Sequence, residues 1–258
     1  MGLSNMQIGD DHWPDGPFLD RPGPDEVHVW RIDLMTSPRA GSTLYDTLSE
    51  DEVARAARFI YDRHRDAFIA ARSSLRMILG RYLARSPASL AFTYGPYGKP
   101  YLAQEGEGSG LQFNLSHAGA MALVAVVQGR DVGVDIERIE AGRAHEEIAE
   151  RFFAAEEVEA FRSVPQAARV EAFFNGWTRK EAFMKASGQG LTLGLDRFCV
   201  TLRPGEPAAV LSTAWDPDEA GRWSMTALYP APNYAAALAV EGKGLQLIRR
   251  SWGRIASE

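Results

Sequence analysis

Hydrophobic and polar residues alternate in several short segments, as they do in strands that bury one face. The segment 27–34 is the first, and Val132, Val134 and Ile136 continue the pattern further along the chain. Together with the surrounding turn residues, this pattern predicts strands at 27–34, 111–115, 121–127, around Asp135, and at 197–202, 208–213, 222–229 and 234–240. The turn at 128–131 further predicts that the strand 121–127 and the Asp135 strand form an antiparallel hairpin.

Other segments carry their apolar residues at helical spacing. Ser49 and Glu52 match a capping box, which opens a helix that runs toward Tyr61. Gly188 suits the residue after the last turn of a helix. The full set of predicted helices is 49–61, 67–84, 145–152, 155–163 and 167–187. Since both halves mix helices with strands that look antiparallel, we predict an α+β fold with two similarly built lobes, each a small antiparallel sheet packed with helices.

Composition narrows the class of protein. The chain has 258 residues, of which 45% are hydrophobic, and a formal net charge of -6. This acidic balance argues against a general nucleic-acid binder, which usually carries a basic face. The longest apolar run, 121–127, is too short to span a bilayer, and the first residues do not resemble a secretory signal. We therefore expect a cytoplasmic protein that binds neither membranes nor nucleic acids.

The Pro-, Gly- and Asp-rich start of the chain lacks periodicity and suggests an irregular arm. The expected organisation has four parts: an N-terminal arm at 1–25, an N-terminal lobe at 26–130, a C-terminal lobe at 131–245 and a C-terminal tail at 246–258.

Two acids and a lysine indicate candidate chemistry. Asp135 and Glu137 are two residues apart on a predicted strand, so their side chains share a face and repel each other unless a cation lies between them. Glu181 and Lys185 lie one turn apart on one face of a predicted helix. Three carboxylates and a lysine suit Mg²⁺-assisted chemistry on a phosphate.

Three motifs carry a resemblance to a known family. Residues 113–117 (FNLSH), 133–137 (GVDIE) and 177–185 (WTRKEAFMK) resemble the signatures of 4'-phosphopantetheinyl transferases. The match is to the larger, surfactin-synthetase type, which is a pseudo-dimer within one chain. Residues 97–100 (YGKP) and the run 72–83 also resemble that family, and the resemblance covers roughly residues 27 to 240.

The resemblance implies an enzyme that transfers the 4'-phosphopantetheine group of coenzyme A to a serine of an apo acyl or peptidyl carrier protein. The reaction would release adenosine 3',5'-bisphosphate, and the active site would lie in the cleft between the lobes of a monomer. It implies Mg²⁺, with Mn²⁺ as an alternative, bound by Asp135, Glu137 and Glu181. Glu181 would also be the general base, and Lys185 would assist the leaving group. The residues implied in binding coenzyme A are Arg55, Arg65, Tyr97, Lys99, Pro100, Ser116, His117, Asp135 and Lys185.

Two alternatives remain open at this point. A Mg²⁺-dependent nuclease or phosphohydrolase also combines several acids with a lysine, although Glu137 is followed by Arg138, Ile139 and Glu140 rather than by a close lysine. A catalytically silent module that binds coenzyme A or a carrier domain is the other alternative.

Overall fold

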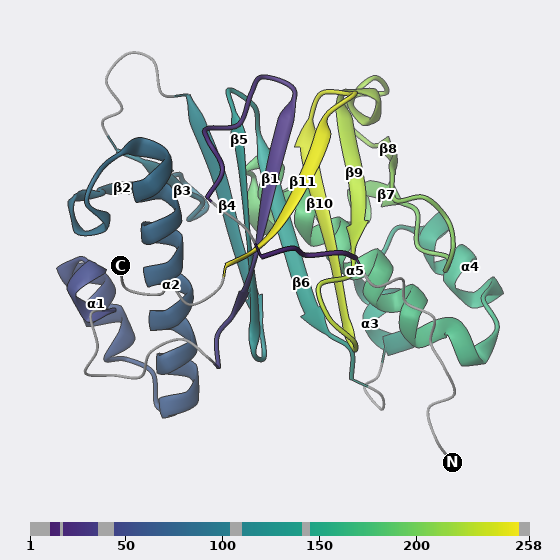
Figure 1. Ribbon diagram of the computed structural model, residues 1–258. Coiled ribbons are helices and arrows are strands. Elements are labelled where there is room, and N and C mark those ends of the chain that lie inside the picture. The colour runs from purple at the N-terminus through teal and green to yellow at the C-terminus, as the bar shows by residue number, and fades with distance from the viewer. Residues whose placement is uncertain (1–10, 16–17, 36–43, 104–109, 141–144, 253–258) are drawn as a thin grey trace.

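Two long helices, α2 (Asp62–Leu83) and α5 (Arg169–Ser187), cover the outer faces of two sheets that pack against each other (Figure 1). The computed structural model describes residues 11–15, 18–35, 44–103, 110–140 and 145–252. Within these ranges the order of layers is α2, a four-stranded sheet, a three-stranded sheet and α5. The α+β fold expected from the sequence is confirmed.

The four-stranded sheet has the order β11-β1-β5-β4. Its strands are β1 (Glu26–Asp33), β4 (Leu111–Ala118), β5 (Met121–Gln128) and β11 (Gln246–Trp252). The three-stranded sheet has the order β6-β10-β9, formed by β6 (Val132–Arg138), β9 (Trp223–Leu228) and β10 (Tyr234–Glu241). Two small antiparallel pairs complete the described strands: β2 (Phe92–Tyr94) with β3 (Pro100–Leu102), and β7 (Phe198–Val200) with β8 (Val210–Thr213).

Side chains alternate between the two faces of a strand, and this places β5 and β10 each between two apolar cores. On β5, Leu123, Ala125 and Val127 enter the core between the sheets, whereas Val124 and Val126 pack toward α2. On β10, Ala237 and Ala239 pack against α5, and the intervening residues join the central core. A strand with apolar residues on both faces is buried on both sides, and β5 and β10 are accordingly almost wholly apolar.

The shorter helices flank this frame. α1 (Glu50–Ala56) lies beside α2, and α3 (His145–Phe152) and α4 (Ala155–Ser163) pack with α5 around Phe161 and Phe173 (Figure 1). The predicted capping box is confirmed, because the Ser49 N–H donates to Glu52 Oε2 over 3.0 Å. The predicted first helix ends earlier than expected, at Ala56, and the second begins earlier, at Asp62.

The predicted hairpin between β5 and β6 is wrong. β5 pairs with β1 and β4, while β6 pairs with β10 in the other sheet. Val132, Val134 and Ile136 share the central core with Leu123 and Ala125, so β6 buries its apolar face by packing against the first sheet rather than by extending it. The turn at 128–131 therefore connects the two sheets.

The last described strand belongs to the first sheet. Residues 246–252, which the sequence suggested as part of a tail, form β11 and run parallel to β1. In the expected N-terminal arm, Trp13 is buried in the central core and Phe18 stacks on Trp30 with ring centroids 5.0 Å apart. Residues 1–10, 16–17 and 253–258 of the arm and tail lie outside the described residues. The boundary between lobes near residue 130 stays a prediction.

Among the described residues we find no helix both long and apolar enough to cross a membrane.

Candidate active site

Asp135 lies where β6 and α5 approach most closely. A Cβ atom at Gly133 would stand 2.1 Å from the Ala182 carbonyl oxygen, so only glycine allows this contact. Asp135, two residues along on the same face, is therefore directed toward α5 and is only 3% exposed. Its Oδ1 accepts hydrogen bonds from Lys185 Nζ at 2.6 Å and Ser116 Oγ at 2.9 Å. These contacts bring together three predicted site residues from β4, β6 and α5.

Glu181 is the next acid at this place. Burial, followed by the negative charge of Asp135, raises the pKa of the Glu181 carboxyl, against the opposing charge of Lys185. The two carboxylates are thus close enough to interact. Glu137 lies half-buried on the same face of β6 as Asp135.

The acids suit a hard cation by their chemistry. Across the residues that the structure describes, no three His, Cys, Asp or Glu side chains are already grouped as metal ligands. However, Asp135 Oδ2 is buried without a hydrogen-bond partner, next to the repelling carboxylate of Glu181. Oxygen donors of this kind fit Mg²⁺. The assignment of Asp135, Glu137 and Glu181 as ligands of one ion stays a prediction.

On α5, Trp177 and Lys180 lie close to Glu181 in the sequence, but their contacts are with residues of the protein interior. Trp177 stacks on Phe173 with ring centroids 5.8 Å apart. Lys180 is fully buried and donates to the carbonyl oxygens of Leu195 and Phe198, with Glu157 Oε2 2.6 Å away. Lys180 therefore points away from Asp135, in agreement with its place about 100° around the helix from Glu181.

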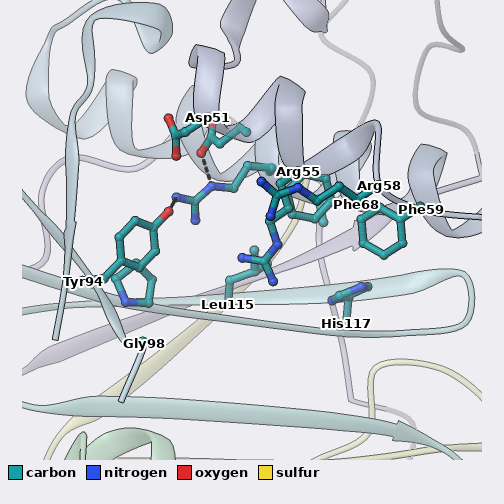
Figure 2. Close-up of a pocket in the computed structure, with 13 residues that line it drawn as sticks. Asp51, Arg55, Arg58, Phe59, Phe68, Tyr94, Gly98, Leu115 and His117 are labelled. Carbon is teal, nitrogen blue, oxygen red and sulfur yellow. Dashed lines mark hydrogen bonds and ion pairs between the residues drawn. The ribbon is translucent and has the colours of Figure 1, made fainter. Parts of the chain in front are cut away.

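A cavity of about 850 Å³ opens on the other side of β4. Figure 2 shows Arg55 and Arg58 facing Leu115 and His117 across this hollow. Arg72 also lines it, so three guanidinium groups and an imidazole surround the space together with the carboxylates of Asp51 and Glu52. Guanidinium groups bind phosphates through paired N–H donors, and this cavity is suited to a phosphorylated ligand. Its described lining residues all come from the segment 51–117.

The two arginines implied in binding coenzyme A differ in their position relative to this cavity. Arg55, one of the two, lines it. Arg65 is not among its lining residues and instead pairs with Asp62 at 3.1 Å and Asp66 at 3.7 Å. Arg58 and Arg72 were not selected from the sequence. One feature of the sequence could have pointed to Arg72. It lies four residues before Arg76, so the two arginines share one face of a helix, and the neighbouring helix α1 begins with acidic residues that can pair with them.

His117 lies between the two regions. Burial, then the charges of Lys185 and Arg55, lowers the pKa of its imidazole, so one neighbour on each side of β4 acts on it. Its sequence neighbour Ser116 is buried and accepts from Lys185 Nζ at 2.9 Å while donating to Asp135. The Ser116 hydroxyl is therefore part of the acid–lysine centre in this structure.

Lys99 joins the hairpin of β2 and β3 to α5. It is 8% exposed, and its Nζ donates to the Ala186 carbonyl oxygen at 2.7 Å and to Asp131 Oδ1 at 3.2 Å. Burial lowers the pKa of Lys99, against the charge of Asp131. Tyr97, Lys99 and Pro100 line a second cavity of about 210 Å³, together with Lys185. This smaller cavity, unlike the larger one, is lined from both halves of the chain.

Comparison with known proteins decides the family. Residues 36–129 match the family model "4'-phosphopantetheinyl transferase, N-terminal", and residues 131–239 match that of the 4'-phosphopantetheinyl transferase superfamily. The chain is 42% identical over 222 residues to 4'-phosphopantetheinyl transferase HetI from Nostoc sp., covering 86% of this chain and 90% of that protein. The chain belongs to the 4'-phosphopantetheinyl transferase family. Its function as a phosphopantetheinyl-transferring enzyme follows from that membership.

Two further relatives support the assignment of this transferase. It is 31% identical to 4'-phosphopantetheinyl transferase Sfp from Bacillus subtilis over 167 residues, which cover 60% of this chain and 72% of the relative. It is 34% identical to 4'-phosphopantetheinyl transferase psf-1 from Bacillus pumilus over 149 residues, covering 58% and 60% of the two chains. The N-terminal match contains the arginine cavity, and the superfamily match contains Asp135, Glu181 and Lys185.

Proposed function

We propose that this transferase moves 4'-phosphopantetheine from coenzyme A to a serine of an apo acyl or peptidyl carrier protein, with Mg²⁺ as its metal and Mn²⁺ as an alternative. The observation that carries the proposal is the position of Ser116 and His117. Ser116 contacts Asp135 and Lys185, and His117 lines the arginine cavity next to them. A ligand that can place one phosphate in the arginine cavity and a second phosphate group at the acid–lysine centre fits this arrangement.

Coenzyme A carries two separate groups of phosphates, and the two regions offer a place for each. The cavity with Arg55, Arg58 and Arg72 suits the 3'-phosphate, which is the more compact group and concentrates its charge on a single phosphorus. The neighbourhood of Lys185 suits the pyrophosphate. The smaller cavity beside Tyr97 and Pro100 adjoins both and suits the adenine ring.

The residues of the centre divide the chemistry between them. The Glu181 carboxylate takes the proton of the carrier serine, directly or through a water, and the serine oxygen attacks the phosphorus on the pantetheine side. The bond between this phosphorus and the bridging oxygen breaks, and adenosine 3',5'-bisphosphate leaves. Lys185 stabilises and protonates the departing oxygen. Mg²⁺, held by Asp135, Glu137 and Glu181, would neutralise charge on the pyrophosphate.

The position of Glu181 beside Asp135 and Lys185 suits the role of a base for the incoming serine. A nuclease or phosphohydrolase lacks comparable support, since the relatives are named as transferases. A monomeric state and a cytoplasmic location stay predictions.

Intact-mass spectrometry tests the proposal directly. Apo carrier proteins from fatty-acid, polyketide and peptide synthesis are incubated with the transferase, coenzyme A and Mg²⁺. We expect a mass gain of one phosphopantetheine group on at least one carrier, lost on chelation and in Glu181→Gln. The matched control is Glu159→Gln, an exposed acid on α4. Release of adenosine 3',5'-bisphosphate without any carrier gain would instead support a phosphohydrolase.

A further inference from the structure

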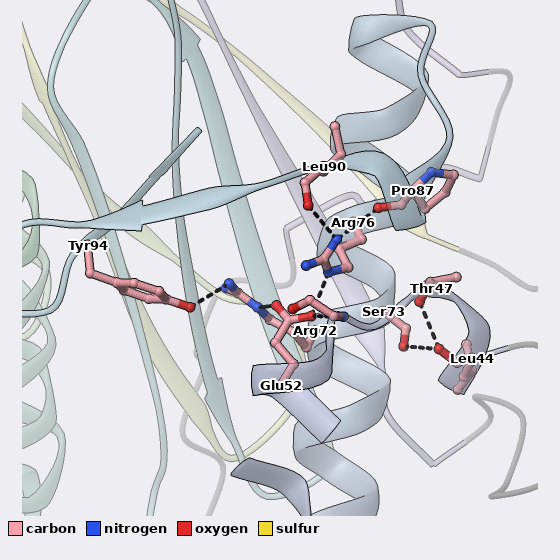
Figure 3. A network of polar contacts seen from close by, with 10 residues as sticks. Leu44, Thr47, Glu52, Arg72, Ser73, Arg76, Pro87, Leu90 and Tyr94 are labelled. Carbon is pink, nitrogen blue, oxygen red and sulfur yellow. Dashed lines mark hydrogen bonds and ion pairs between the residues drawn. The ribbon is translucent and has the colours of Figure 1, made fainter. Parts of the chain in front are cut away.

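A buried carboxylate holds two arginines beside the larger cavity. Glu52 on α1 is 2% exposed and accepts from the Nε atoms of both Arg72 and Arg76, the latter at 2.6 Å (Figure 3). Arg72 and Arg76 lie one turn apart on α2, and both guanidinium groups stack over the Phe92 ring, 4.3 Å and 5.0 Å from its centroid. The two cations would repel each other without the carboxylate between them.

The two arginines have different surroundings. Arg76 is 1% exposed, and its Nη1 donates to the Pro87 and Leu90 carbonyl oxygens at 2.9 Å and 2.8 Å. Its donors are therefore directed into the protein. Arg72 instead lines the cavity, and its Nη2 donates to the hydroxyl of Tyr94 at 3.1 Å (Figure 3). Arg72 is thus the member of the pair that a ligand can reach.

The charge of the group matters because Glu52 also lines the cavity. A free carboxylate there would repel an anionic ligand. Burial raises the pKa of Glu52, but the charge of Arg72, the Ser49 N–H and the hydrogen bonds from both arginines outweigh it and keep the pKa below its ordinary value. The ionised carboxylate with two guanidinium ions leaves one net positive charge, presented to the cavity through Arg72.

We propose that Glu52 is a positioning residue that holds the Arg72 guanidinium ready for the 3'-phosphate of coenzyme A. This inference rests on the proposed function, because that function places the 3'-phosphate in the arginine cavity. Arg55 and Arg58 are exposed, whereas Arg72 is 7% exposed and held at three points. A fixed guanidinium loses less side-chain entropy on binding than an exposed one.

Calorimetric titration of two nucleotides separates positioning from folding. Adenosine 3',5'-bisphosphate and adenosine 5'-monophosphate differ only in the 3'-phosphate. The Kd of the monophosphate divided by the Kd of the bisphosphate therefore measures how strongly the protein recognises the 3'-phosphate. In Glu52→Gln we expect this ratio to fall about tenfold or more, since a charge-assisted contact is lost, with little change for the monophosphate. Glu50→Gln, an exposed acid on the same helix, should leave the ratio unchanged. An unchanged ratio in folded Glu52→Gln would overturn the inference.

A second variant decides the question if Glu52→Gln does not fold. Arg72→Lys leaves Glu52 paired with Arg76 and keeps the charge, but it removes the fork that Glu52 orients. We expect its ratio to fall in the same way, and an unchanged ratio would count against the inference. Failure of the proposed function gives a different result, because the wild-type protein would then bind the two nucleotides equally or not at all.

Discussion

The ammonium group of Lys185 lies 2.6 Å from Asp135 Oδ1, and both share the hydroxyl of Ser116. Lys185 therefore neutralises a nearly buried carboxylate and joins α5 to β6 at the proposed centre. The bridge has two consequences that can be measured separately, one on stability and one on turnover.

Removal of Lys185 should affect both properties. In Lys185→Met, the buried Asp135 keeps only the Ser116 hydrogen bond, and we expect the free energy of unfolding to fall by about 1–3 kcal/mol. Chemical denaturation measures this change. In the double variant Asp135→Asn/Lys185→Met, most of the stability should return because the buried negative charge of Asp135 is gone. Phosphopantetheine transfer should be abolished in both variants, because both lack the Lys185 ammonium group. Equal stability of Lys185→Met and the wild-type protein would contradict the role of the bridge.

Replacement of Asp135 tests the metal assignment. We expect Asp135→Ala to abolish carrier modification and to weaken Mn²⁺ binding, because an oxygen donor is lost from the proposed ligand set. Paramagnetic resonance of free Mn²⁺ in a titration measures binding independently of activity. Asp33→Ala, an exposed acid at the end of β1, is the control. Near-normal turnover or unchanged Mn²⁺ affinity in Asp135→Ala would remove Asp135 from the metal site.

Close packing at Gly133 should be essential for the centre. In Gly133→Ala the new Cβ would meet the backbone of Ala182 and Ala186, so α5 must move away from β6. We expect a loss of about 1–3 kcal/mol in unfolding free energy and a fall in kcat larger than the change in KM for coenzyme A. Gly221→Ala, which meets no atom within 4 Å, is the control. A crystal structure of Gly133→Ala with α5 in place would refute the expectation.

The buried pair of Lys180 and Glu157 should stabilise the C-terminal half. Lys180→Met removes the cation beside the Glu157 carboxyl, which is 2% exposed and whose pKa burial raises, and we expect a cost of about 3–5 kcal/mol, measured by chemical denaturation. Glu157→Gln/Lys180→Met should recover part of this loss, because the buried carboxyl without its cation is removed. A cost below about 1 kcal/mol for Lys180→Met would show that the pair is not a major source of stability.

Binding of a nucleotide should change the protonation of His117. Although the His117 side chain is exposed overall, desolvation by the surrounding protein and the charges of Lys185 and Arg55 hold the pKa of free His117 below its ordinary value. A bound phosphate would offset these charges and raise the pKa. At a pH between the His117 pKa of the free protein and that of the complex, the complex binds more protons than the free protein. Affinity for adenosine 3',5'-bisphosphate should therefore rise as the pH falls through this window. Calorimetry in buffers of different ionisation enthalpy measures the proton uptake. His117→Gln should abolish it, and exposed His12→Gln should not.

Much of the secondary structure follows from local patterns. The helices at 145–152 and 155–163 were predicted with their observed bounds, because helix spacing and caps are properties of neighbouring residues. The positions of Asp135 on a strand and of Glu181 and Lys185 on one helix face were predicted for the same reason. Local patterns do not predict the contact between β6 and α5 that brings them together, since it depends on the missing side chain at Gly133; the family resemblance alone implied that these residues meet.

The sequence by itself therefore determined the helices and most of the strands, the residue types of the centre and the family. Only the tertiary structure decided that β6 leaves the first sheet, that β11 pairs with β1 in parallel, and that Arg72 rather than Arg65 reaches the cavity. The physical reason is range. Periodicity records which face of an element is apolar, whereas strand partners and the pairing of an arginine depend on burial and charge supplied by distant segments.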